Sequence, residues 1–342
     1  MTGAASQAMT HDPAVPLSAR RLAFVFPGQG SQKVGMGKAW AAVSPAARSA
    51  FDEADAALGF PLSRLCWEGP EDELNLTANT QPALLATSIA VLRGLAADAA
   101  GSGLRPLAVA GHSLGEYSAL VAAGALDFAE ALHLVRQRGR LMQAAVPVGE
   151  GAMAAVIGLD AEAVAAVAAD AAREVPGEVC AVANLNGPAQ TVLAGHKGAV
   201  DRAVALARER GARKATLLAV SAPFHSPLMR PAREAMAVHL RAASLRDPAV
   251  PVVVNADAAP ATTAEAVRDA LVRQIDSPVR WVESILWMSR EAGVDAFLEV
   301  GPGSVLSGLN RRIVPGLLCA SAGDPEQLRK LLAGGVEAGK EA

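Results

Sequence analysis

The sequence predicts an α/β protein in which a smaller unit is inserted into a larger one. Strand-like and helix-like segments succeed one another along the chain, one serine lies at a strand-to-helix corner, and residues 149–220 contain a complete set of alternating elements. The 342 residues are enough for about two domains or one large α/β domain. We expect an N-terminal flexible extension at 1–20, a larger subdomain at 21–148 and 221–320, the insertion at 149–220, and a C-terminal tail at 321–342.

The larger subdomain is expected to begin with an apolar strand, Leu22 to Phe26, that runs into a glycine-rich turn at 27–32. A second strand and an apolar helix lie within Leu107 to Gly124, and a Gly-His-Ser-Leu-Gly turn joins them. Because glycines on both sides of this turn allow the chain to bend sharply, the hydroxyl of Ser113 is expected to project from the corner.

Ser113 is the candidate nucleophile of an acyl transfer. The N-terminal end of the following helix favours negative charge. An oxyanion that forms when the hydroxyl attacks an acyl carbon would meet the backbone N–H of Leu114 there. A Gly-x-Ser-x-Gly string by itself is equally consistent with a structural turn, but the strand before it and the helix after it favour the nucleophile.

The next helix is predicted to begin at Asp127, which would form an Asp-x-x-Glu capping box with Glu130. At about 100° per residue, Arg138 lies on the apolar face of this helix, whereas the arginines two residues before and after it lie nearly opposite. A guanidinium that faces inward keeps its proton and needs an anionic partner, which is either a protein carboxylate or a ligand.

Residues 149–220 are predicted to form strand, helix, strand, strand, helix and strand in that order, which is the ferredoxin-like arrangement. The turn Asn186-Gly187-Pro188 would connect the two middle strands. The chain then returns to the larger subdomain with an amphipathic helix, a strand within 251–257, further helices, a strand at 295–300 and a helical C-terminal tail.

His225 is the candidate general base among the six histidines, because prolines on both sides predict a non-helical loop around it. A lone loop histidine is also typical of a solvated surface, but a serine nucleophile needs a proton acceptor. His112, next to Ser113, is expected to pack beneath the turn. No aspartate is evident as a third triad member, so a backbone carbonyl is the alternative group to orient the imidazole.

Composition argues against several classes of protein. The 31 basic and 34 acidic residues are nearly balanced and form no basic block, so nucleic acid is not an expected partner. Apolar stretches fall short of the ~18 residues of a membrane span, and residues 1–20 lack the pattern of a secretory signal, so we expect a cytoplasmic protein without a membrane segment. Cys66, Cys180 and Cys319 are widely separated, which favours buried thiols over disulfides or a zinc site.

Several separated motifs, taken together and in this order, closely resemble the malonyl-CoA:acyl carrier protein transacylase family. They are Phe26-Pro-Gly-Gln-Gly-Ser-Gln32, Thr80-Gln-Pro-Ala83, Gly111-His-Ser-Leu-Gly-Glu116, Arg136-Gln-Arg-Gly-Arg-Leu-Met-Gln143, Phe224-His225 and Glu299-Val-Gly-Pro-Gly303. The resemblance covers about Arg21 to Ala320. It implies an α/β-hydrolase-like larger subdomain, a ferredoxin-like smaller subdomain and an active site in the cleft between them.

The resemblance also implies roles for individual residues. It makes Ser113 the residue that is malonylated and His225 the base that takes its proton. The backbone N–H groups of Gln29 and Leu114 would form the oxyanion hole. Gln274 matches the family glutamine whose backbone carbonyl holds the imidazole.

The substrate-binding residues follow from the same resemblance. Arg138 matches the arginine that grips the free carboxylate of malonate, in agreement with its position on the apolar helix face. Phe224 resembles the bulky residue of malonyl-selecting members, which crowds the space of an α-methyl branch. Gln81 would line the same pocket, or else Gln-Pro marks the start of a helix.

The implied reaction is a ping-pong transfer of malonyl from malonyl-CoA to the phosphopantetheine thiol of acyl carrier protein in fatty acid synthesis, with no metal or bound cofactor. We expect a monomer whose exposed basic residues, among them Arg311 and Arg312, meet the CoA phosphates and the acidic carrier. The alternatives are a discrete acyltransferase of a polyketide pathway, a serine hydrolase, and a non-catalytic carrier-binding module. An inward Arg138 argues against the hydrolase, and the intact Ser113, His225 and Arg138 argue against the module.

Overall fold

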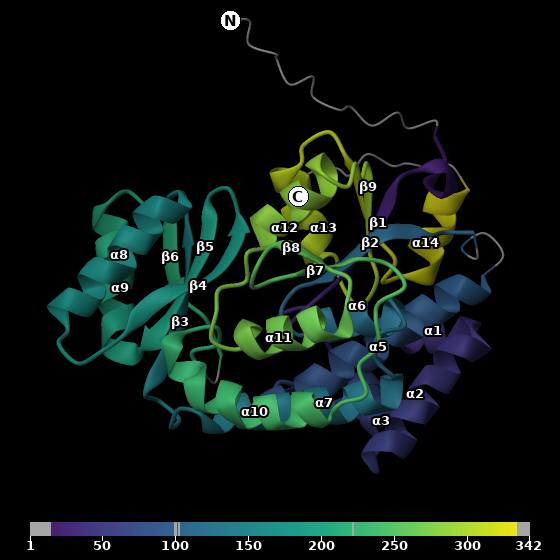
Figure 1. The fold of residues 1–342 in the computed structure, drawn as a ribbon, viewed down its shortest axis with the longest axis horizontal. Helices are drawn as coiled ribbons and strands as arrows, with labels where there is room; N and C mark the ends of the chain where they lie inside the picture. The colour runs from purple at the N-terminus through teal and green to yellow at the C-terminus, as the bar shows by residue number, and fades with distance from the viewer. Residues whose placement is uncertain (1–14, 99–100, 102, 221, 334–342) are drawn as a thin grey trace, which may run out of the picture.

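Two β-sheets organise the chain, and Figure 1 shows the smaller sheet with its two helices beside the larger, helix-covered one. The computed structural model describes residues 15–98, 101, 103–220 and 222–333. Most of the predicted N-terminal extension, the end of the predicted tail and position 221 lie outside the described residues. Within the extension, the 3₁₀ helix η1 (Leu17–Ala19) buries Leu17 in the core, so packing begins before residue 21.

The larger sheet has the strand order β10-β9-β1-β2-β7-β8. Five of its strands are parallel, and β8 is antiparallel to β7. The bounds are β1 (Leu22–Phe26), β2 (Pro106–Gly111), β7 (Val252–Val254), β8 (Ala259–Ala261), β9 (Ala296–Glu299) and β10 (Leu318–Ser321). The sequence predicts β1 with these bounds, and it predicts strands at the positions of β7 and β9, but it does not predict β8 or β10.

Strand β1 shows why the larger sheet is apolar throughout. All five of its residues are buried, and they alternate between two cores. Leu22, Phe24 and Phe26 face the core shared with most of the helices, whereas Ala23 and Val25 face the core that includes α12 (Trp281–Arg290) and α13 (Val305–Ile313). A parallel strand covered on both faces is expected to read as a continuous apolar run.

Helices cover the larger sheet. Between β1 and β2 the chain forms five of them, and others follow β2, β6, β8 and β10. Their bounds are α1 (Lys38–Val43), α2 (Pro45–Leu58), α3 (Leu62–Glu68), α4 (Glu71–Leu74), α5 (Thr77–Ala97), α6 (Gly115–Ala122), α7 (Phe128–Ala144), α10 (Arg230–Ala242), α11 (Ala264–Gln274) and α14 (Pro325–Leu332). No helix in the described part of the chain is long and apolar enough to cross a membrane.

One predicted helix start and one predicted capping box are wrong. Helix α5 begins at Thr77, so Pro82 lies inside it; its N-cap, Leu76, has no side-chain acceptor and therefore gives no signal in the sequence. Helix α7 does begin after Asp127, but the capping box does not form. The carboxylate of Asp127 accepts a hydrogen bond from Arg246, and that of Glu130 accepts one from the N–H of Ser244, so both hold the segment after α10.

The smaller sheet is entirely antiparallel, with the strand order β4-β5-β3-β6. Its elements follow the predicted order: β3 (Gly151–Ile157), α8 (Ala161–Glu174), β4 (Cys180–Gly187), β5 (Gln190–His196), α9 (Lys197–Glu209) and β6 (Lys214–Leu217). The helices α8 and α9 pack on it over a core of small aliphatic side chains. Strand β4 also contacts the larger part, because the N–H and C=O of Val279 bond to Ala183 and Leu185 on this strand at 2.9 Å.

The turn between β2 and α6 depends on close backbone approaches. A Cβ on Gly111 would lie 1.8 Å from the carbonyl carbon of Gly115, and a Cβ on Gly115 would lie 2.1 Å from the carbonyl oxygen of Phe26. Neither neighbour is a flexible side chain that can move aside. The two glycines of the Gly-x-Ser-x-Gly string are therefore required by space at this corner.

We predict that Gly115→Ala lowers the free energy of unfolding by about 3 kcal/mol or more, because the new methyl group overlaps the backbone of Phe26. Chemical denaturation measures this change. Gly308→Ala is the matched control: it lies in α13 with no atom within 4 Å of the added Cβ, and we expect a gain of about 0.5–1 kcal/mol. Equal stability of Gly115→Ala and the wild type would contradict the prediction.

Candidate active site

Ser113 lies in the turn between β2 and α6, directly after the carboxyl end of a buried parallel strand. Its φ angle is +52°, a left-handed conformation that is uncommon for a residue other than glycine. The N–H of His112 donates to the carbonyl of Phe26 at 3.0 Å, which ties the turn to the end of β1. Ser113 is thus held in a strained conformation just beyond the carboxyl end of β2.

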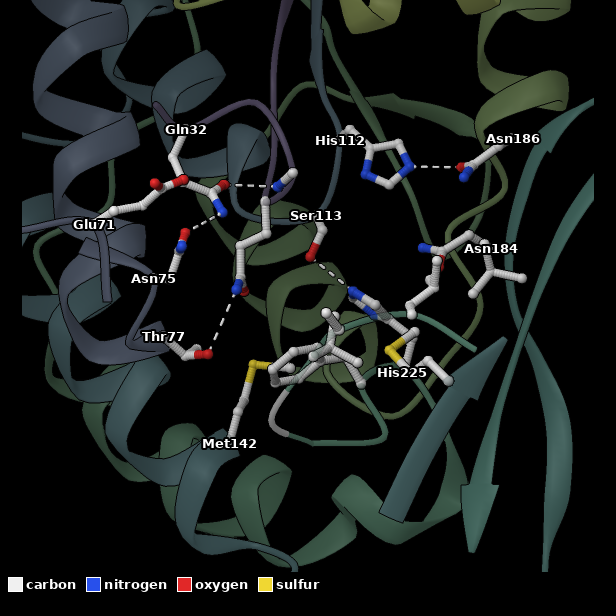
Figure 2. Close-up of a pocket in the computed structure, with 18 residues that line it drawn as sticks. Gln32, Glu71, Asn75, Thr77, His112, Ser113, Met142, Asn184, Asn186 and His225 are labelled. Carbon is white, nitrogen blue, oxygen red and sulfur yellow. Dashed lines mark hydrogen bonds between the residues drawn. The ribbon is translucent and has the colours of Figure 1, made fainter. Parts of the chain in front are cut away.

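His225 reaches Ser113 from a loop 112 residues further along the chain. The Nε2 atom lies 2.7 Å from the Ser113 Oγ, and the Nδ1 atom lies 2.9 Å from the carbonyl oxygen of Gln274 (Figure 2 shows the first contact). A carbonyl can only accept, so Nδ1 carries the proton and Nε2 is free to accept one from the serine hydroxyl. The two ring nitrogens therefore have the roles that a general base requires.

Arg138 lies in α7 with its side chain buried, as the helical periodicity predicts. Its guanidinium donates to the side-chain oxygens of Gln81 at 2.9 Å and Gln274 at 2.8 Å, and to the Ser113 Oγ at 3.1 Å. None of the ion pairs among the described residues involves it. Its three partners are neutral, so an anionic partner would have to come from a ligand.

Gln274, the last residue of α11, contributes its side chain as well as its carbonyl. The amide oxygen accepts from Arg138, and the amide nitrogen donates to the carbonyl of Ser113 and to the carboxylate of Glu116, both at 2.9 Å. The family resemblance implies only the contact of its backbone carbonyl with His225. The side-chain contacts depend on the tertiary structure, because the partners come from two other segments, α7 and the turn that leads into α6.

Two residues of the site were missed from the sequence. Asn255 follows β7; its side chain accepts from the N–H of Ser113 at 2.7 Å and donates to the carbonyl of Gly111 at 2.8 Å. Glu116, in the first turn of α6, is fully buried and accepts from the N–H of Asn255 at 2.9 Å. Each carried a signal: Asn255 is a polar residue at the end of a buried strand, and Glu116 is a lone acidic residue in an apolar helix.

A cavity of about 740 Å³ opens above Ser113, between the larger sheet and the smaller one. Asn184 and Asn186 of β4 line it on the same side as His225, opposite Asn75, Thr77 and Met142 (Figure 2). Ser113 and Phe224 line it as well. Both asparagines belong to β4, whose pairing with β5 shifts register between Leu185 and Gly187. The cavity therefore exposes Ser113 and His225 to the space between the two sheets.

The other predicted site residues differ in their relation to the cavity. Gln29 lies in the turn after β1 and lines it, whereas Leu114 is the buried N-cap of α6. Gln81 does not line the cavity, contrary to the first expectation, because its side chain is fully buried against Arg138. Gln81 therefore holds the guanidinium and does not face the ligand space.

The expectation that His112 packs beneath the turn is wrong. Its ring lines the cavity, and its Nε2 atom lies 2.8 Å from the side-chain oxygen of Asn186. The ring also contacts Trp281, with 5.5 Å between the ring centres. The sharp turn does separate His112 from Ser113, as expected, but it directs the imidazole sideways to the smaller sheet, so His112 bridges the two parts of the site.

Burial lowers the pKa of His225 and so favours its neutral imidazole. Desolvation, followed by the positive charge of Arg138, lowers the pKa of His225 to about 3. Burial also lowers the pKa of His112 and raises that of Glu116 to about 7. The imidazole of His225 is therefore neutral at physiological pH and available to accept a proton.

Comparisons with known proteins agree on one family. Residues 23–315 match the model of the acyl transferase domain family. The chain is 48% identical over 312 residues to the malonyl CoA-acyl carrier protein transacylase of Escherichia coli K12, an alignment that covers 91% of this chain and 99% of that protein.

Solved structures give the same result. The acyl-carrier-protein S-malonyltransferase of Burkholderia pseudomallei 1710b superposes with a TM-score of 0.87 at 48% identity, covering 92% of this chain and 99% of that one. A malonyl-transacylase in complex with a type II PKS acyl carrier protein superposes with a TM-score of 0.87 at 46% identity, with the same coverage. These relatives share both the parallel sheet and the separate antiparallel sheet.

We predict that the imidazole of His225 remains neutral at about pH 5, where an ordinary histidine is about 97% protonated. A nitrogen NMR titration of the histidine rings measures this, with His225→Ala to assign the signal. In Arg138→Leu the pKa of His225 should rise, because a neighbouring positive charge is lost. A His225 ring that titrates between about pH 6 and 7 in the wild type would contradict the prediction.

Proposed function

This chain belongs to the malonyl CoA-acyl carrier protein transacylases of the acyl transferase domain family, and we propose that it transfers malonyl from malonyl-CoA to the phosphopantetheine thiol of an acyl carrier protein through an ester on Ser113. The main support for this mechanism is the set of contacts that the Ser113 Oγ atom makes. The Ser113 Oγ meets the basic nitrogen of His225 at 2.7 Å and the guanidinium of Arg138 at 3.1 Å. The site thus combines a nucleophile, its base and a carboxylate-binding group.

In the first half-reaction, His225 Nε2 takes the hydroxyl proton as the Ser113 Oγ attacks the thioester carbon of malonyl-CoA. The C–O bond forms, the carbonyl becomes an oxyanion, and the C–S bond then breaks as the imidazolium returns the proton to the sulfur of CoA. In the second half-reaction the thiol of the carrier protein gives its proton to His225 and attacks the malonyl ester. The Ser113 hydroxyl is regenerated, and the malonyl thioester leaves on the carrier.

The backbone N–H groups of Gln29 and Leu114 are the proposed oxyanion hole. Strands β1 and β2 are parallel neighbours, and their last residues, Phe26 and Gly111, are register partners. Gln29 lies three residues after Phe26, and Leu114 lies three residues after Gly111. Their backbones therefore both lie just beyond the carboxyl ends of these two neighbouring strands. Leu114 follows Ser113 directly in the chain, and Gln29 lines the same cavity as Ser113, where the charge of the tetrahedral intermediate would develop.

Arg138 is the proposed binding group for the free carboxylate of malonate. That carboxylate is separated from the reacting carbonyl by one methylene group, so it must lie near the Ser113 Oγ. The guanidinium of Arg138 contacts the Ser113 Oγ. Its hydrogen bonds to Gln81 and Gln274 fix the orientation of the guanidinium plane. A charge-assisted contact of this kind favours malonyl over acetyl groups. Phe224, which lines the cavity, is proposed to crowd an α-methyl branch.

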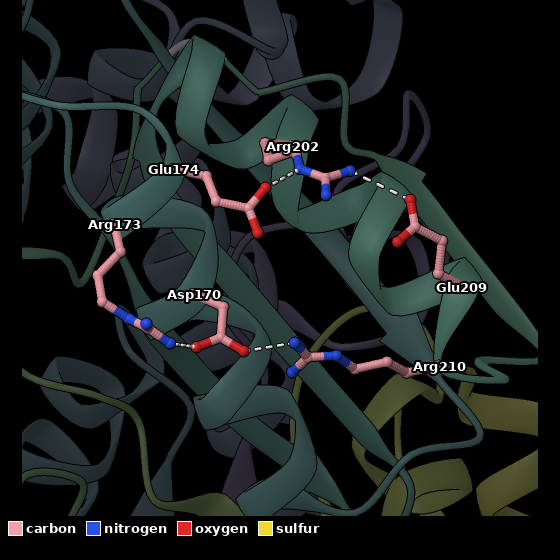
Figure 3. A network of polar contacts seen from close by, with 6 residues as sticks. All are labelled: Asp170, Arg173, Glu174, Arg202, Glu209 and Arg210. Carbon is pink, nitrogen blue, oxygen red and sulfur yellow. Dashed lines mark hydrogen bonds and ion pairs between the residues drawn. The ribbon is translucent and has the colours of Figure 1, made fainter.

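We further propose that the larger part is an α/β-hydrolase-like subdomain (21–148 and 221–320) and the smaller a ferredoxin-like subdomain (149–220). The strand order β4-β5-β3-β6 and its separate core support the smaller unit. Surface ion pairs within it also tie α8 to α9 (Figure 3). Asp170 accepts from Arg173 and Arg210, and Arg202 donates to Glu174 and Glu209.

The proposed partners are malonyl-CoA and an acyl carrier protein, and the enzyme is proposed to act as a monomer without metal or bound cofactor. A related malonyl-transacylase has been solved with a type II PKS acyl carrier protein, which supports carrier binding and keeps a polyketide carrier as the second candidate. Arg311 and Arg312 are exposed on the last turn of α13, and their cationic groups suit an acidic carrier or the CoA phosphates.

We predict that brief incubation with malonyl-CoA adds one malonyl group to the protein and that carrier protein in its phosphopantetheine form removes it. Intact-mass and peptide mass spectrometry locate the adduct on Ser113, and Ser113→Ala should form none. Parallel reactions with fatty acid and polyketide carriers identify the natural acceptor. Loss of the adduct at the same rate with and without carrier would point instead to a hydrolase.

We predict that Arg138→Ala lowers the rate of malonylation by roughly 100-fold or more while it changes acetylation by acetyl-CoA much less. The reason is that only malonyl carries the carboxylate that the guanidinium binds. Rates of Ser113 acylation with each thioester, measured in the same preparation, give the ratio. Arg140→Ala, on the exposed face of α7, is the matched control. Equal loss with both thioesters would contradict the carboxylate role.

A further inference from the structure

A buried carboxylate that takes no direct part in the mechanism lies behind the nucleophile. We propose that Glu116 is a positioning residue whose single oxygen Oε2 holds Asn255 and Gln274, so that Ser113, His225 and Arg138 are aligned at the same time. This inference rests on the proposed function, since it concerns the alignment of the same groups. It assigns no contact with substrate to Glu116.

Glu116 is placed for this role by the nucleophile turn itself. It lies in the first turn of α6, three residues after Ser113, and its side chain is 1% exposed. Its Oε2 atom accepts from the backbone N–H of Asn255 and from the side-chain nitrogen of Gln274, each at 2.9 Å. One atom of α6 therefore joins the end of β7 to the end of α11.

Both partners of this oxygen hold Ser113 directly. The side-chain oxygen of Asn255 accepts from the N–H of Ser113 at 2.7 Å, and the side-chain nitrogen of Gln274 donates to its carbonyl at 2.9 Å. The backbone of Ser113 is thus clamped on both sides. This matters because its φ angle of +52° is a strained conformation that must be imposed by its surroundings.

Gln274 extends the same network to the other two groups. Its side-chain oxygen accepts from Arg138 at 2.8 Å, and its backbone carbonyl accepts from Nδ1 of His225 at 2.9 Å. An amide side chain can rotate by half a turn and exchange its donor and acceptor. The contacts with Arg138 and Glu116 together oppose that exchange, because a guanidinium can only donate to the amide oxygen and Oε2 of Glu116 accepts from the amide nitrogen.

The role of Glu116 requires an acceptor atom and not a negative charge. Both donors to Oε2 are neutral amides, and no ion pair among the described residues includes Glu116. Its other oxygen, Oε1, has no hydrogen-bond partner among the described residues. Burial raises the pKa of this carboxyl to about 7, and Oε2 can accept in either protonation state provided that the proton is on Oε1. A glutamine at this position would keep the acceptor.

The test compares Glu116→Ala, which removes the acceptor, with Glu116→Gln, which keeps it. The matched control is Glu299→Ala: Glu299 is also fully buried and accepts from two backbone N–H groups, those of Leu306 and Ser307, but at the start of α13. Thermal unfolding reports the stability of each variant. Single-turnover acylation of Ser113 by malonyl-CoA and by acetyl-CoA, per folded molecule, reports alignment.

We expect Glu116→Ala to lower malonylation by about 100-fold and the ratio of malonylation to acetylation by about 10-fold, because small displacements at a reacting centre are costly and Arg138 loses its support. Glu116→Gln should restore the rate to within about 5-fold of wild type. Glu299→Ala should lose stability and keep both the rate and the ratio.

The proposal is overturned if Glu116→Ala keeps the wild-type rate and ratio per folded molecule, or if Glu116→Gln recovers no more activity than Glu116→Ala. A wild-type protein that takes up no malonyl group contradicts the proposed function itself. Normal malonylation of the wild type with an unchanged Glu116→Ala contradicts only the role of Glu116, so the two failures are distinguishable.

Discussion

A buried guanidinium without a carboxylate partner among the described residues is the constraint on which the rest of the site depends. Burying a charge is expensive unless hydrogen bonds compensate for it. Here the compensation for Arg138 comes from the neutral oxygens of Gln81, Gln274 and Ser113. None of these three acceptors carries a negative charge, which suits a site that takes an anionic acyl group. A protein carboxylate in direct contact would compete with the substrate.

The same charge affects the base. Arg138 adds to desolvation in lowering the pKa of His225, so the free site holds a neutral imidazole that accepts a proton weakly. A malonyl carboxylate bound to the guanidinium would cancel much of that charge. In the proposed mechanism, selection of the acyl group and strengthening of the base would therefore be linked through the side chain of Arg138. An acetyl group, which lacks the carboxylate, would leave the base in its weaker state.

The architecture explains how distant segments meet at this point. Ser113 follows β2, Asn255 follows β7, and Gln29 follows β1, and these three strands are parallel neighbours in one sheet. The carboxyl ends of parallel strands lie on the same side of the sheet, so polar residues that follow these strands lie close together. Helices α7 and α11 add Arg138 and Gln274 from the side. The antiparallel sheet closes the cavity, with β4 held by Val279 and by the contact of His112 with Asn186.

The sequence by itself determined the features that depend on local order: the bounds of β1, the nucleophile turn, the inward face of Arg138 and the order of elements in residues 149–220. These follow from steric limits and periodicity, which act over a few residues. Tertiary structure alone decided the partners. The carboxylates of Asp127 and Glu130 bind the segment after α10 instead of capping α7, and Glu116 and Asn255 join the site. A polar side chain bonds to whatever donor or acceptor the fold brings within about 3 Å, and that neighbour is not encoded nearby in the chain.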